Sequence, residues 1–330
     1  MRILITGATG YIGKELAKRL AASGQQVHAL YRSEAKIADL RHENILLFKG
    51  DMTDKAALTA AMQGCESVYH LAALAGVWAK DPNAFLNANF HAVRQLLDIA
   101  NEQGVRRVVL TSTGGAAGPS ADGKPVQEAP FRQPRFFSDY EKSKWLMEDY
   151  VFHQYAGKTE VIIVNPTRVF GPGLLTESNG VTRMVQLYLK GRFRMLPASQ
   201  RIGNYTYVDD VVQGHLLAME KGRHKERYLL GGYDLSYREL FDLLARLSGK
   251  SYRMFNLPAS ALYFMAHAQQ ISNRLFNTRP MFTPVWVDKL VRHDWLVSSQ
   301  KAQEELGYRP TNVEDAFRQT IDWLNANQKD

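Results

Sequence analysis

A tyrosine and a lysine four positions apart indicate proton-transfer chemistry near the middle of the chain. Tyr140 and Lys144 lie in the segment 139–155, whose pattern predicts a helix, and a spacing of four places both on one helix face. A nearby ammonium favours the phenolate and lowers a phenol pKa that is normally about 10. Such a phenol can donate a proton to a carbonyl oxygen that is being reduced. Ordinary amphipathic helices contain the same spacing, so the interpretation needs a partner.

That partner is a hydroxyl-bearing strand end upstream of the helix. Residues 108–111 form an apolar run that predicts a strand, and Ser112 and Thr113 follow it directly. In a parallel sheet the carboxyl ends of the strands form the edge at which nicotinamide cofactors bind. We therefore expect these hydroxyl groups to stand beside a nicotinamide.

A glycine-rich turn near the start of the chain predicts the cofactor site itself. The apolar run 3–6 leads into Gly-Ala-Thr-Gly-Tyr-Ile-Gly at 7–13, and a helical pattern follows. The three glycines permit a tight turn, close approach of a pyrophosphate and close packing of helix on strand. Backbone N–H groups at the start of the helix then hold the anion. The loop residues expected to contact the dinucleotide are Gly7, Thr9, Gly10, Tyr11, Ile12 and Gly13.

The residues after the second predicted strand favour NADP(H) over NAD(H). NAD-binding sheets usually carry an acid about 20 residues after the glycines, where it accepts from the ribose 2′-hydroxyl. The stretch 28–33 has no acid and contains Arg32 and Ser33 instead. A guanidinium matches a phosphate in charge and geometry. We predict that Arg32 binds the 2′-phosphate; the alternatives are a solvent-facing Arg32 and NAD(H) as the cofactor.

Two residues after the third predicted strand could contact the adenine. Asp51 could accept from the adenine amino group while Met52 packs on the ring. The alternative is that Asp51 caps the helix predicted at 55–62, a role that Thr53 or Asp54 could also fill.

The elements that position these residues alternate regularly through the first half of the chain. Short apolar runs suit strands covered on both faces, and their alternation with helical segments predicts an α/β fold with a doubly wound parallel sheet. The predicted strands are 3–6, 27–30, 45–48, 67–71, 108–111 and 161–164. The predicted helical segments are 12–22, 56–62, 85–100 and 139–155.

The regular alternation of predicted strands and helices ends after Pro166, which suggests a second structural unit. The helix predicted at 207–217 and the strand predicted at 227–230 return to the first domain. We therefore assign 1–170 and 205–234 to a dinucleotide-binding Rossmann domain. The ranges 171–204 and 235–330 would form a smaller, discontinuous and mainly helical substrate lobe.

Composition excludes some protein classes and leaves others open. The chain has 330 residues, 45% of them hydrophobic and 22% charged, as in an ordinary globular protein. Its formal charge of +8 fits a nucleic acid, an anionic membrane surface, a phosphate-bearing ligand or simply a basic surface. Cys65 is the single cysteine, so no intramolecular disulfide can form. No apolar run reaches 18 residues and no secretory signal is evident. We expect a soluble cytoplasmic protein without stable membrane insertion, nucleic-acid binding or a metal site.

The ordered set of motifs resembles the extended short-chain dehydrogenase/reductases, also described as the NAD(P)-dependent epimerase/dehydratase family. The glycine loop, the strand-end hydroxyls and the Tyr140–Lys144 pair carry the resemblance. Further similar stretches follow in the same order, at 70–73, 87–90, 165–173, 207–211 and 305–310. The resemblance therefore covers nearly the whole chain.

The resemblance implies a role for each matching residue. Tyr140 would be the general acid or base, and Lys144 would hold the nicotinamide ribose and lower the pKa of Tyr140. Thr113, aligned by its spacing to Gly118, would hydrogen-bond the substrate oxygen, with Ser112 as the neighbouring candidate. Asn89 would support the active site. Residues expected beside the cofactor are Leu71, Ala72, Ala73 and Pro166. A homodimer through the helices at 83–100 and 139–155 is a further expectation.

Within the family, the second lobe must distinguish reductases from enzymes that act on nucleotide sugars. Sugar-nucleotide members often carry a diphosphate-binding arginine where this chain has Gly203. The overall resemblance is to the dihydroflavonol-reductase-like branch. We predict NADPH-dependent reduction of a ketone or aldehyde. Nucleotide-sugar epimerisation or dehydration is the alternative, and a non-catalytic NADP-binding sensor is a third interpretation.

Aromatic residues in the expected pocket segments favour an apolar small-molecule substrate. Trp78, Phe137 and Tyr205, together with Thr113, are the residues that we expect to contact it. Further aromatic residues of these segments are Phe136, Tyr263, Phe264, Phe276 and Phe282. Part of this set could equally form the core of the lobe.

Overall fold

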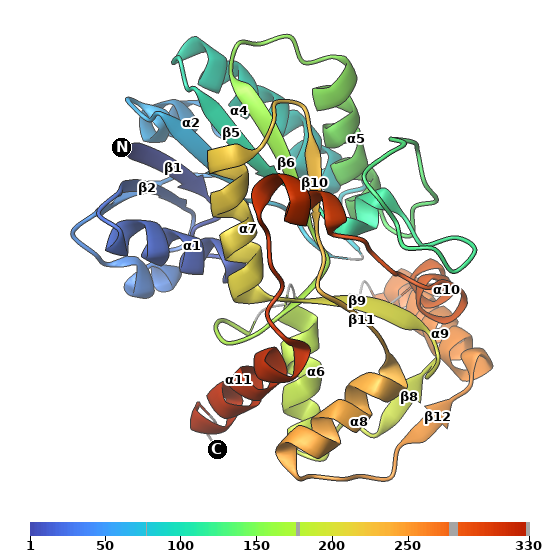
Figure 1. Ribbon diagram of the computed structural model, residues 1–330. Helices are drawn as coiled ribbons and strands as arrows, with labels where there is room; N and C mark the ends of the chain where they lie inside the picture. Colours follow the sequence, from blue (N-terminus) through green and yellow to red (C-terminus); the bar gives the residue numbers. More distant parts are fainter. Residues whose placement is uncertain (77, 176–178, 277–282, 328–330) are drawn as a thin grey trace.

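A seven-stranded parallel sheet forms the centre of the molecule (Figure 1). The computed structural model describes residues 1–76, 78–175, 179–276 and 283–327. The strand order is β10-β6-β5-β4-β1-β2-β3, and every neighbouring pair is parallel. The strands are β1 (Arg2–Thr6), β2 (Gln26–Tyr31), β3 (Ile45–Lys49), β4 (Ser67–His70), β5 (Arg107–Thr111), β6 (Glu160–Pro166) and β10 (Arg227–Leu230). This confirms the doubly wound sheet and all six strands predicted in the first half.

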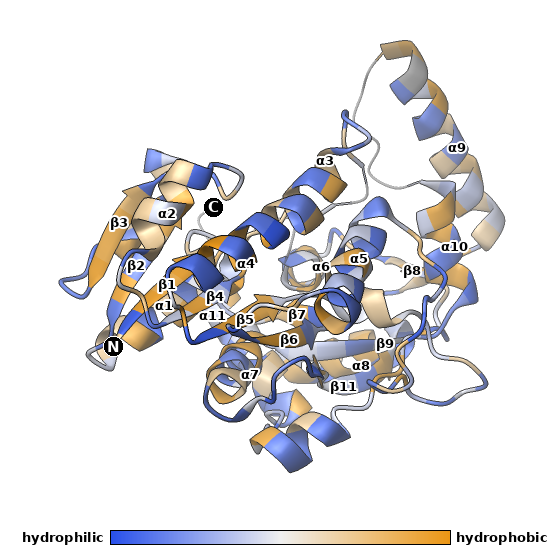
Figure 2. Cartoon of the chain, turned by 90° about the horizontal axis from the view of Figure 1, so that it is seen from above, coloured by the Kyte–Doolittle hydropathy of each residue, from blue (hydrophilic) through white to orange (hydrophobic). Residues whose placement is uncertain are grey.

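Each strand contributes to two hydrophobic cores because successive side chains point to opposite faces. In β1, Ile3 and Ile5 pack with residues of α1 (Tyr11–Ala22) and α7 (Val208–Lys221). Leu4, between them, packs with α2 (Lys55–Met62), α4 (Ala92–Glu102) and α5 (Asp139–His153). Figure 2 shows the apolar strands between helices whose outer surfaces are largely hydrophilic. Burial on both faces explains the continuous apolar runs in the sequence.

The helix predicted at 85–100 is interrupted. A short helical turn, α3 (Ala84–Leu86), leads into a π-helical turn at Asn87–His91, and α4 continues from Ala92. The other helical predictions correspond to α1, α2 and α5. π-Helical turns occur frequently at functional sites, and this one contains Asn89.

The remaining elements lie beyond the carboxyl edge of the large sheet. A three-stranded sheet has the order β11-β9-β7, and a two-stranded sheet pairs β12 with β8. Their strands are β7 (Arg168–Phe170), β8 (Met195–Pro197), β9 (Ile202–Tyr207), β11 (Tyr233–Ser236) and β12 (Phe255–Leu257). The helices are α6 (Gly180–Leu189), α8 (Tyr237–Ser248), α9 (Ala259–Phe276), α10 (Pro284–Arg292) and α11 (Val313–Ala326). As predicted, α7 and β10 return to the large sheet, where β10 pairs with β6.

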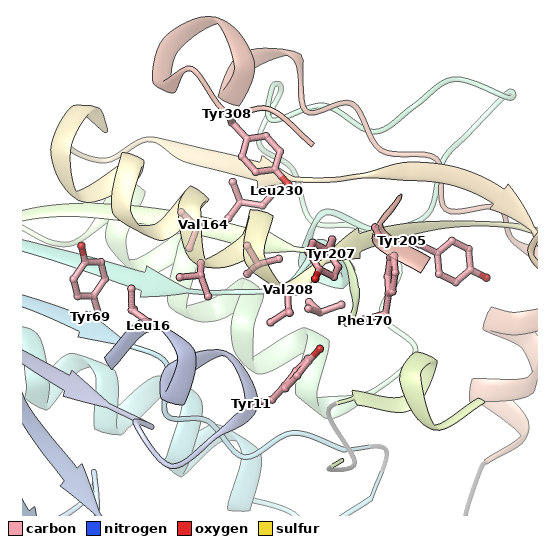
Figure 3. Close-up of a cluster of buried hydrophobic side chains, with 14 of the residues drawn as sticks. Tyr11, Leu16, Tyr69, Val164, Phe170, Tyr205, Tyr207, Val208, Leu230 and Tyr308 are labelled. Atoms are coloured by element: carbon pink, nitrogen blue, oxygen red, sulfur yellow. The ribbon is translucent and has the colours of Figure 1, made fainter. Parts of the chain in front are cut away.

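One hydrophobic cluster joins the large sheet to these later elements (Figure 3). Tyr11, at the start of α1, lies in the same cluster as Tyr207 and Val208. Phe170 of β7 stacks on Phe317 of α11, with ring centroids 4.0 Å apart. The cluster explains how β7, which follows β6 directly, is held in place. Within the described part of the chain, no helix combines the length and apolar character needed to cross a bilayer.

Candidate active site

The glycine loop has the geometry that a pyrophosphate requires. Gly7 adopts φ +76°, and a Cβ on it would lie 2.6 Å from the backbone nitrogen of Ala72. A Cβ on Gly13 would lie 2.2 Å from the carbonyl oxygen of Gly7. Gly10 is the N-cap residue of α1 and has no side chain that could cap the helix. The N–H groups of the first turn therefore remain available to an anion. Larger residues at positions 7 and 13 would displace backbone and close this arrangement.

The segment after β4 lies against the glycine loop. The amide of Leu71 donates to the carbonyl oxygen of Thr6 at 3.1 Å, and the amide of Ala72 donates to Thr6 Oγ1 at 3.4 Å. Leu71, Ala72, Ala73, Thr9 and Gly10 are all partly exposed at this edge. The structure therefore brings two of the segments predicted to contact the dinucleotide, 71–73 and the glycine loop, against each other. The Tyr11 side chain is buried in the core, so only its backbone can face the loop.

Arg32 and Asp51 contact each other at the ends of β2 and β3. Arg32 Nη1 lies 3.1 Å from Asp51 Oδ2, and the arginine side chain is 77% exposed. Asp51 Oδ1 accepts from the amide and hydroxyl of Thr53, whereas Asp54 caps α2 by accepting from Ala56 and Ala57. Asp51 is therefore not the helix cap. Met52 is partly buried and packs against the hydrophobic core that the sheet forms with α2, α4 and α5.

The Thr113 hydroxyl lies near enough to the Tyr140 phenol to act on its pKa. Tyr140 is in the first turn of α5, which Ser138 caps by accepting from the amide of Glu141. Thr113 follows β5 and caps a short 3₁₀ helix by accepting from the amide of Gly115 at 3.2 Å. A phenol and an alcohol are thus presented together at the carboxyl edge of the sheet, where both could contact one carbonyl oxygen.

Ser112 has a different environment from Thr113. Its side chain is buried and donates to Glu148 Oε1. Of the two hydroxyl candidates, Thr113 is therefore the one that the structure places with the phenol.

Lys144 does not lower the pKa of Tyr140 in this structure, contrary to the prediction. The Lys144 ammonium is buried and donates to the carbonyl oxygen of Thr111 at 2.7 Å. Burial lowers the Lys144 pKa to about 8, although Glu148 opposes this shift. Burial and the neighbouring Glu141 carboxylate raise the Tyr140 pKa to about 12, with the Thr113 hydroxyl acting in the other direction. The phenol is therefore protonated at neutral pH and can serve as an acid.

Asn89 connects three segments around these residues. Its Nδ2 donates to the Leu74 carbonyl at 2.9 Å and to Ser143 Oγ at 3.0 Å, while its Oδ1 accepts from the Leu74 amide. Ser143 Oγ in turn donates to the carbonyl oxygen of Tyr140. The side chain is fully buried, so Asn89 positions α5 against the segment after β4.

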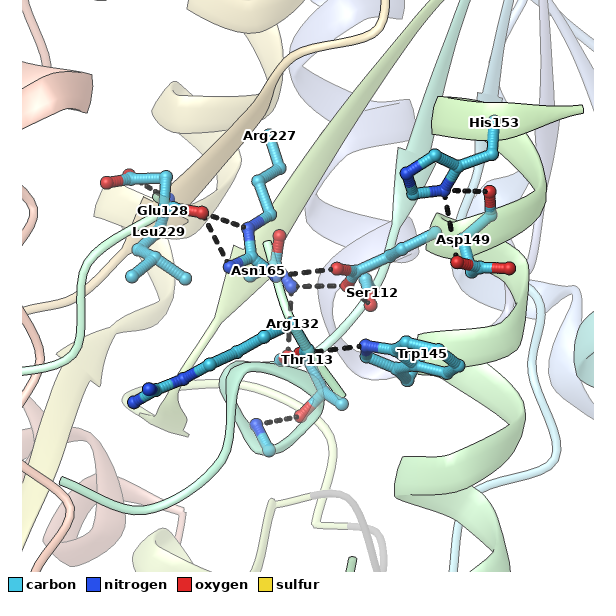
Figure 4. Close-up of polar contacts among 12 residues, drawn as sticks. Ser112, Thr113, Glu128, Arg132, Trp145, Asp149, His153, Asn165, Arg227 and Leu229 are labelled. Carbon is cyan, nitrogen blue, oxygen red and sulfur yellow. Dashed lines mark hydrogen bonds and ion pairs between the residues drawn. The ribbon is translucent and has the colours of Figure 1, made fainter. Parts of the chain in front are cut away.

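A buried ionic network behind the strand end was missed in the sequence (Figure 4). Arg227 Nη1 lies 3.0 Å from Glu148 Oε2, and their side chains are 5% and 0% exposed. Asn165 Nδ2 donates to Glu148 Oε1 at 2.6 Å and to the carbonyl oxygen of Thr113 at 3.0 Å. This network supports the backbone that carries Thr113. Glu148 is four residues after Lys144, so the spacing along one helix face could have revealed it.

His215 of α7 supports the same strand from the other side. Its Nδ1 lies 2.7 Å from the carbonyl oxygen of Val211 and must donate, so Nε2 accepts from Thr111 Oγ1 at 2.8 Å. Burial lowers the His215 pKa to about 4, which keeps the ring neutral. Thr111 is thus held through its side chain by His215 and through its carbonyl by Lys144.

The predicted substrate-contacting residues have different degrees of exposure. Trp78 is half-buried in the segment after β4. Phe137 and Tyr205 are only 3% and 1% exposed, and Phe137 packs on Trp295 with centroids 5.9 Å apart. Phe264 and Phe276 are 75% and 73% exposed, so neither belongs to the core of the lobe. Phe282 lies outside the described residues. The buried Pro166 ends β6.

The parallel sheet, the glycine loop and the Tyr140–Lys144 pair beside a strand-end hydroxyl define a class of NAD(P)-dependent enzymes, the extended short-chain dehydrogenase/reductases. Residues 3–231 match the model of the NAD dependent epimerase/dehydratase family. The chain belongs to this family, whose members are NAD(P)-dependent oxidoreductases, epimerases and dehydratases.

Three similar proteins illustrate the range of the family. The chain is 31% identical to sterol demethylase protein B of Methylococcus capsulatus, over 98% of both chains. It is 28% identical to a putative dihydroflavonol 4-reductase of Synechocystis, over 97% of this chain and 93% of the relative. Its fold matches the crystal structure of Thermus thermophilus UDP-glucose 4-epimerase in complex with NAD, with a TM-score of 0.79, 25% identity and coverage of 99% and 100%. A putative reductase and an epimerase are thus both among these similar proteins.

Proposed function

We propose that this protein reduces a ketone or aldehyde group of a mostly apolar small molecule, with NADPH as the hydride donor. The observation that carries the proposal is the Tyr140 phenol beside the Thr113 hydroxyl at the edge of the sheet. The bound dinucleotide would supply a hydride to the carbonyl carbon. Tyr140 would donate its proton to the carbonyl oxygen, so that one carbonyl, one hydride and one proton give one alcohol.

Other residues of the chain would orient the substrate, support the backbone at Thr113 and bind the cofactor. Thr113 would orient the carbonyl oxygen toward the phenol, and the Glu148–Arg227–Asn165 network would hold the Thr113 backbone. Lys144 would bind the nicotinamide ribose from its position below Thr111. Pro166 would lie beside the nicotinamide and the glycine loop would hold the pyrophosphate.

Gly203 favours reduction over nucleotide-sugar chemistry. Sugar-nucleotide members often have an arginine at this place, and a Cβ on Gly203 would lie 2.2 Å from Arg168 Nη1. An arginine at position 203 could not fit without displacing Arg168. The putative dihydroflavonol 4-reductase among the relatives supports the same choice.

A substrate panel followed at the nicotinamide absorbance tests the proposed function. Hydrophobic ketones and aldehydes should be reduced with stoichiometric loss of NADPH. UDP-, GDP- and dTDP-sugars are the opposing set. Turnover of a nucleotide sugar by protein that retains NAD⁺, with no net change in absorbance and no activity on simple carbonyls, would establish the epimerase alternative instead.

We predict that Arg32→Ala reduces kcat/KM for NADPH by at least about tenfold and has little effect with NADH. The exposed guanidinium has one carboxylate partner, Asp51, and can turn toward a 2′-phosphate. A hydrogen bond to a charged group contributes about 1.5–3 kcal/mol, which corresponds to this loss. The ratio of kcat/KM for the two cofactors is the measurement, with Arg41→Ala as the exposed-arginine control. A preference for NADH that Arg32→Ala leaves unaltered would contradict the assignment.

A further inference from the structure

Arg168, the first residue of β7, places its guanidinium between two tyrosines. Its Nη1 lies 3.3 Å from the Tyr205 hydroxyl and 3.4 Å from the Tyr237 hydroxyl. Its Cζ lies 5.5 Å and 5.7 Å from the centroids of the same two rings. These distances allow cation–π attraction in addition to the long hydrogen bonds. The arginine is therefore held in one place by its surroundings.

Gly203 provides the space for this guanidinium. A Cβ on Gly203 would lie 2.2 Å from Arg168 Nη1 and 2.5 Å from its Cζ. Gly203 is the second residue of β9, where the backbone is extended and does not require glycine. The absence of a side chain at this position therefore serves the close approach of the arginine.

The Arg168 charge has no carboxylate partner among the residues that the structure describes. Its described neighbours are phenols, and burial raises the pKa of Tyr205, so that this phenol is neutral. Arg168 is only partly exposed, and charges removed from water are normally paired. By comparison, Arg227, Arg201 and Arg135 each contact an aspartate or glutamate. A partly buried cation without an anion is a suitable site for an anionic group of a ligand.

Two chains of contacts connect Arg168 to the proposed catalytic residues. Arg168 is three residues from Asn165, which donates to the Thr113 carbonyl, so their Cα atoms are at most about 11 Å apart. Thr167, between them, lies against the backbone at Gly114, next to Thr113. The start of β7, which carries Arg168, therefore follows directly on the backbone that contacts the Thr113 segment.

The second connection runs through β9. Gly203 is bridged to Trp295, whose ring packs on Phe137, and the Phe137 amide donates to Glu141 beside Tyr140. Both connections link the segments that hold the Arg168 guanidinium to the segments that carry Thr113 and Tyr140. An anion bound at Arg168 and a carbonyl oxygen at Thr113 could therefore belong to one small molecule.

We propose that Arg168 binds the carboxylate of an oxo-acid substrate and so sets the orientation of the carbonyl to be reduced. The inference rests on the proposed reductase function and adds the chemical class of the substrate. A planar guanidinium donates two parallel N–H bonds to a carboxylate, which fixes orientation as well as position. Trp78, which is half-buried in the segment after β4, would lie against the apolar remainder of the molecule.

Matched acids and esters test this assignment. Straight-chain oxodecanoic acids that differ in the position of the ketone are compared with their methyl esters, with NADPH as the cofactor. The wild type should prefer the best acid over its ester by at least about tenfold in kcat/KM. Arg168→Met should bring this acid-to-ester ratio close to one. Arg168→Lys keeps the positive charge but loses the planar guanidinium, so it should give an intermediate ratio. Arg201→Met, which removes an arginine paired with Asp294, should keep the wild-type ratio.

Binding without turnover provides the second measurement. Decanoate has the carboxylate of the oxodecanoic acids but no ketone, so it can bind without being reduced. Its affinity for the NADP⁺-loaded protein is measured by calorimetry. Arg168→Met should weaken decanoate binding at least about tenfold, while NADPH affinity and the melting temperature show that the variant is folded.

The outcomes separate this inference from the proposed function. Equal activity on acids and esters, with decanoate binding independent of Arg168, would overturn the carboxylate assignment and leave the reductase function intact. If no carbonyl compound is reduced and UDP-glucose binds in an Arg168-dependent manner, both are overturned, because the cation then serves a diphosphate.

Discussion

Replacing Tyr140 with phenylalanine is expected to reduce kcat for carbonyl reduction by about 10²–10⁴-fold, the usual contribution of a general acid. The substitution removes the hydroxyl group that donates the proton and keeps the ring that packs in the first turn of α5. Because the Tyr140 pKa is raised to about 12, the wild-type phenol carries its proton at neutral pH. Single-turnover measurements with NADPH and a substrate identified in the panel give the rate of the chemical step.

The control for this prediction is Tyr150→Phe. Tyr150 lies on the same helix and packs its ring against Phe90, away from the Thr113 hydroxyl. Tyr150→Phe should retain wild-type kcat, and both variants should retain wild-type affinity for NADPH in a fluorescence titration. Retained turnover in Tyr140→Phe would refute the role of the phenol. Loss of NADPH binding would show that Tyr140 acts through the cofactor site instead.

Breaking the buried Arg227–Glu148 pair is expected to cost about 3–5 kcal/mol of unfolding free energy. Arg227→Met leaves the Glu148 carboxylate without its cation, and both side chains are almost fully removed from water. Arg227 also donates to the carbonyl oxygen of Glu128 through two nitrogens, at 2.7 and 3.1 Å. Urea unfolding followed by circular dichroism measures the change.

Two further variants test the cause of this loss. Arg223 pairs with Glu305 at the surface, with side chains 61% and 30% exposed, so Arg223→Met should cost no more than about 1 kcal/mol. The double variant Arg227→Met/Glu148→Met removes both charges and should be less destabilised than the sum of the two single variants. A cost for Arg227→Met as small as that for Arg223→Met would show that Glu148 does not depend on this cation.

The same network has a consequence for the active site. Glu148 also accepts from Ser112 and Asn165, and Asn165 holds the Thr113 carbonyl. A loss of the arginine should therefore disturb the position of Thr113 as well as the stability of the fold. These contacts connect strands β5, β6 and β10 with helix α5, which lie far apart in the sequence.

Much of the fold was predictable because its signals are local. A strand buried on both faces must be apolar along its whole length, and a turn at φ +76° beside backbone favours glycine at position 7. The return of α7 and β10 to the large sheet also followed from the hydrophobic pattern. The π-helical turn around Asn89 did not, because the hydrogen bonding of a single helical turn has no residue signature of its own in the sequence.

The electrostatics of the site could not be predicted in the same way. The spacing of Tyr140 and Lys144 places them on one helix face, but it does not report burial or other neighbours. In the folded chain Lys144 donates to Thr111, and Glu141 with burial raises the Tyr140 pKa instead of lowering it. The exposure of Phe264 and Phe276 was likewise invisible in the sequence, since aromatic residues suit a core, a pocket or an uncovered helix face equally well.

The sequence by itself determined the class of enzyme, because the glycine loop, the strand-end hydroxyls and the Tyr140–Lys144 pair are local patterns with one order along the chain. Only the tertiary structure decided which hydroxyl faces the phenol and where the charges lie. Ser112 is turned to Glu148 and Thr113 to Tyr140, and Arg168 occupies the space that Gly203 leaves open. The physical reason is that hydrogen bonding, desolvation and charge pairing depend on residues brought together from distant segments, which spacing along the chain does not encode.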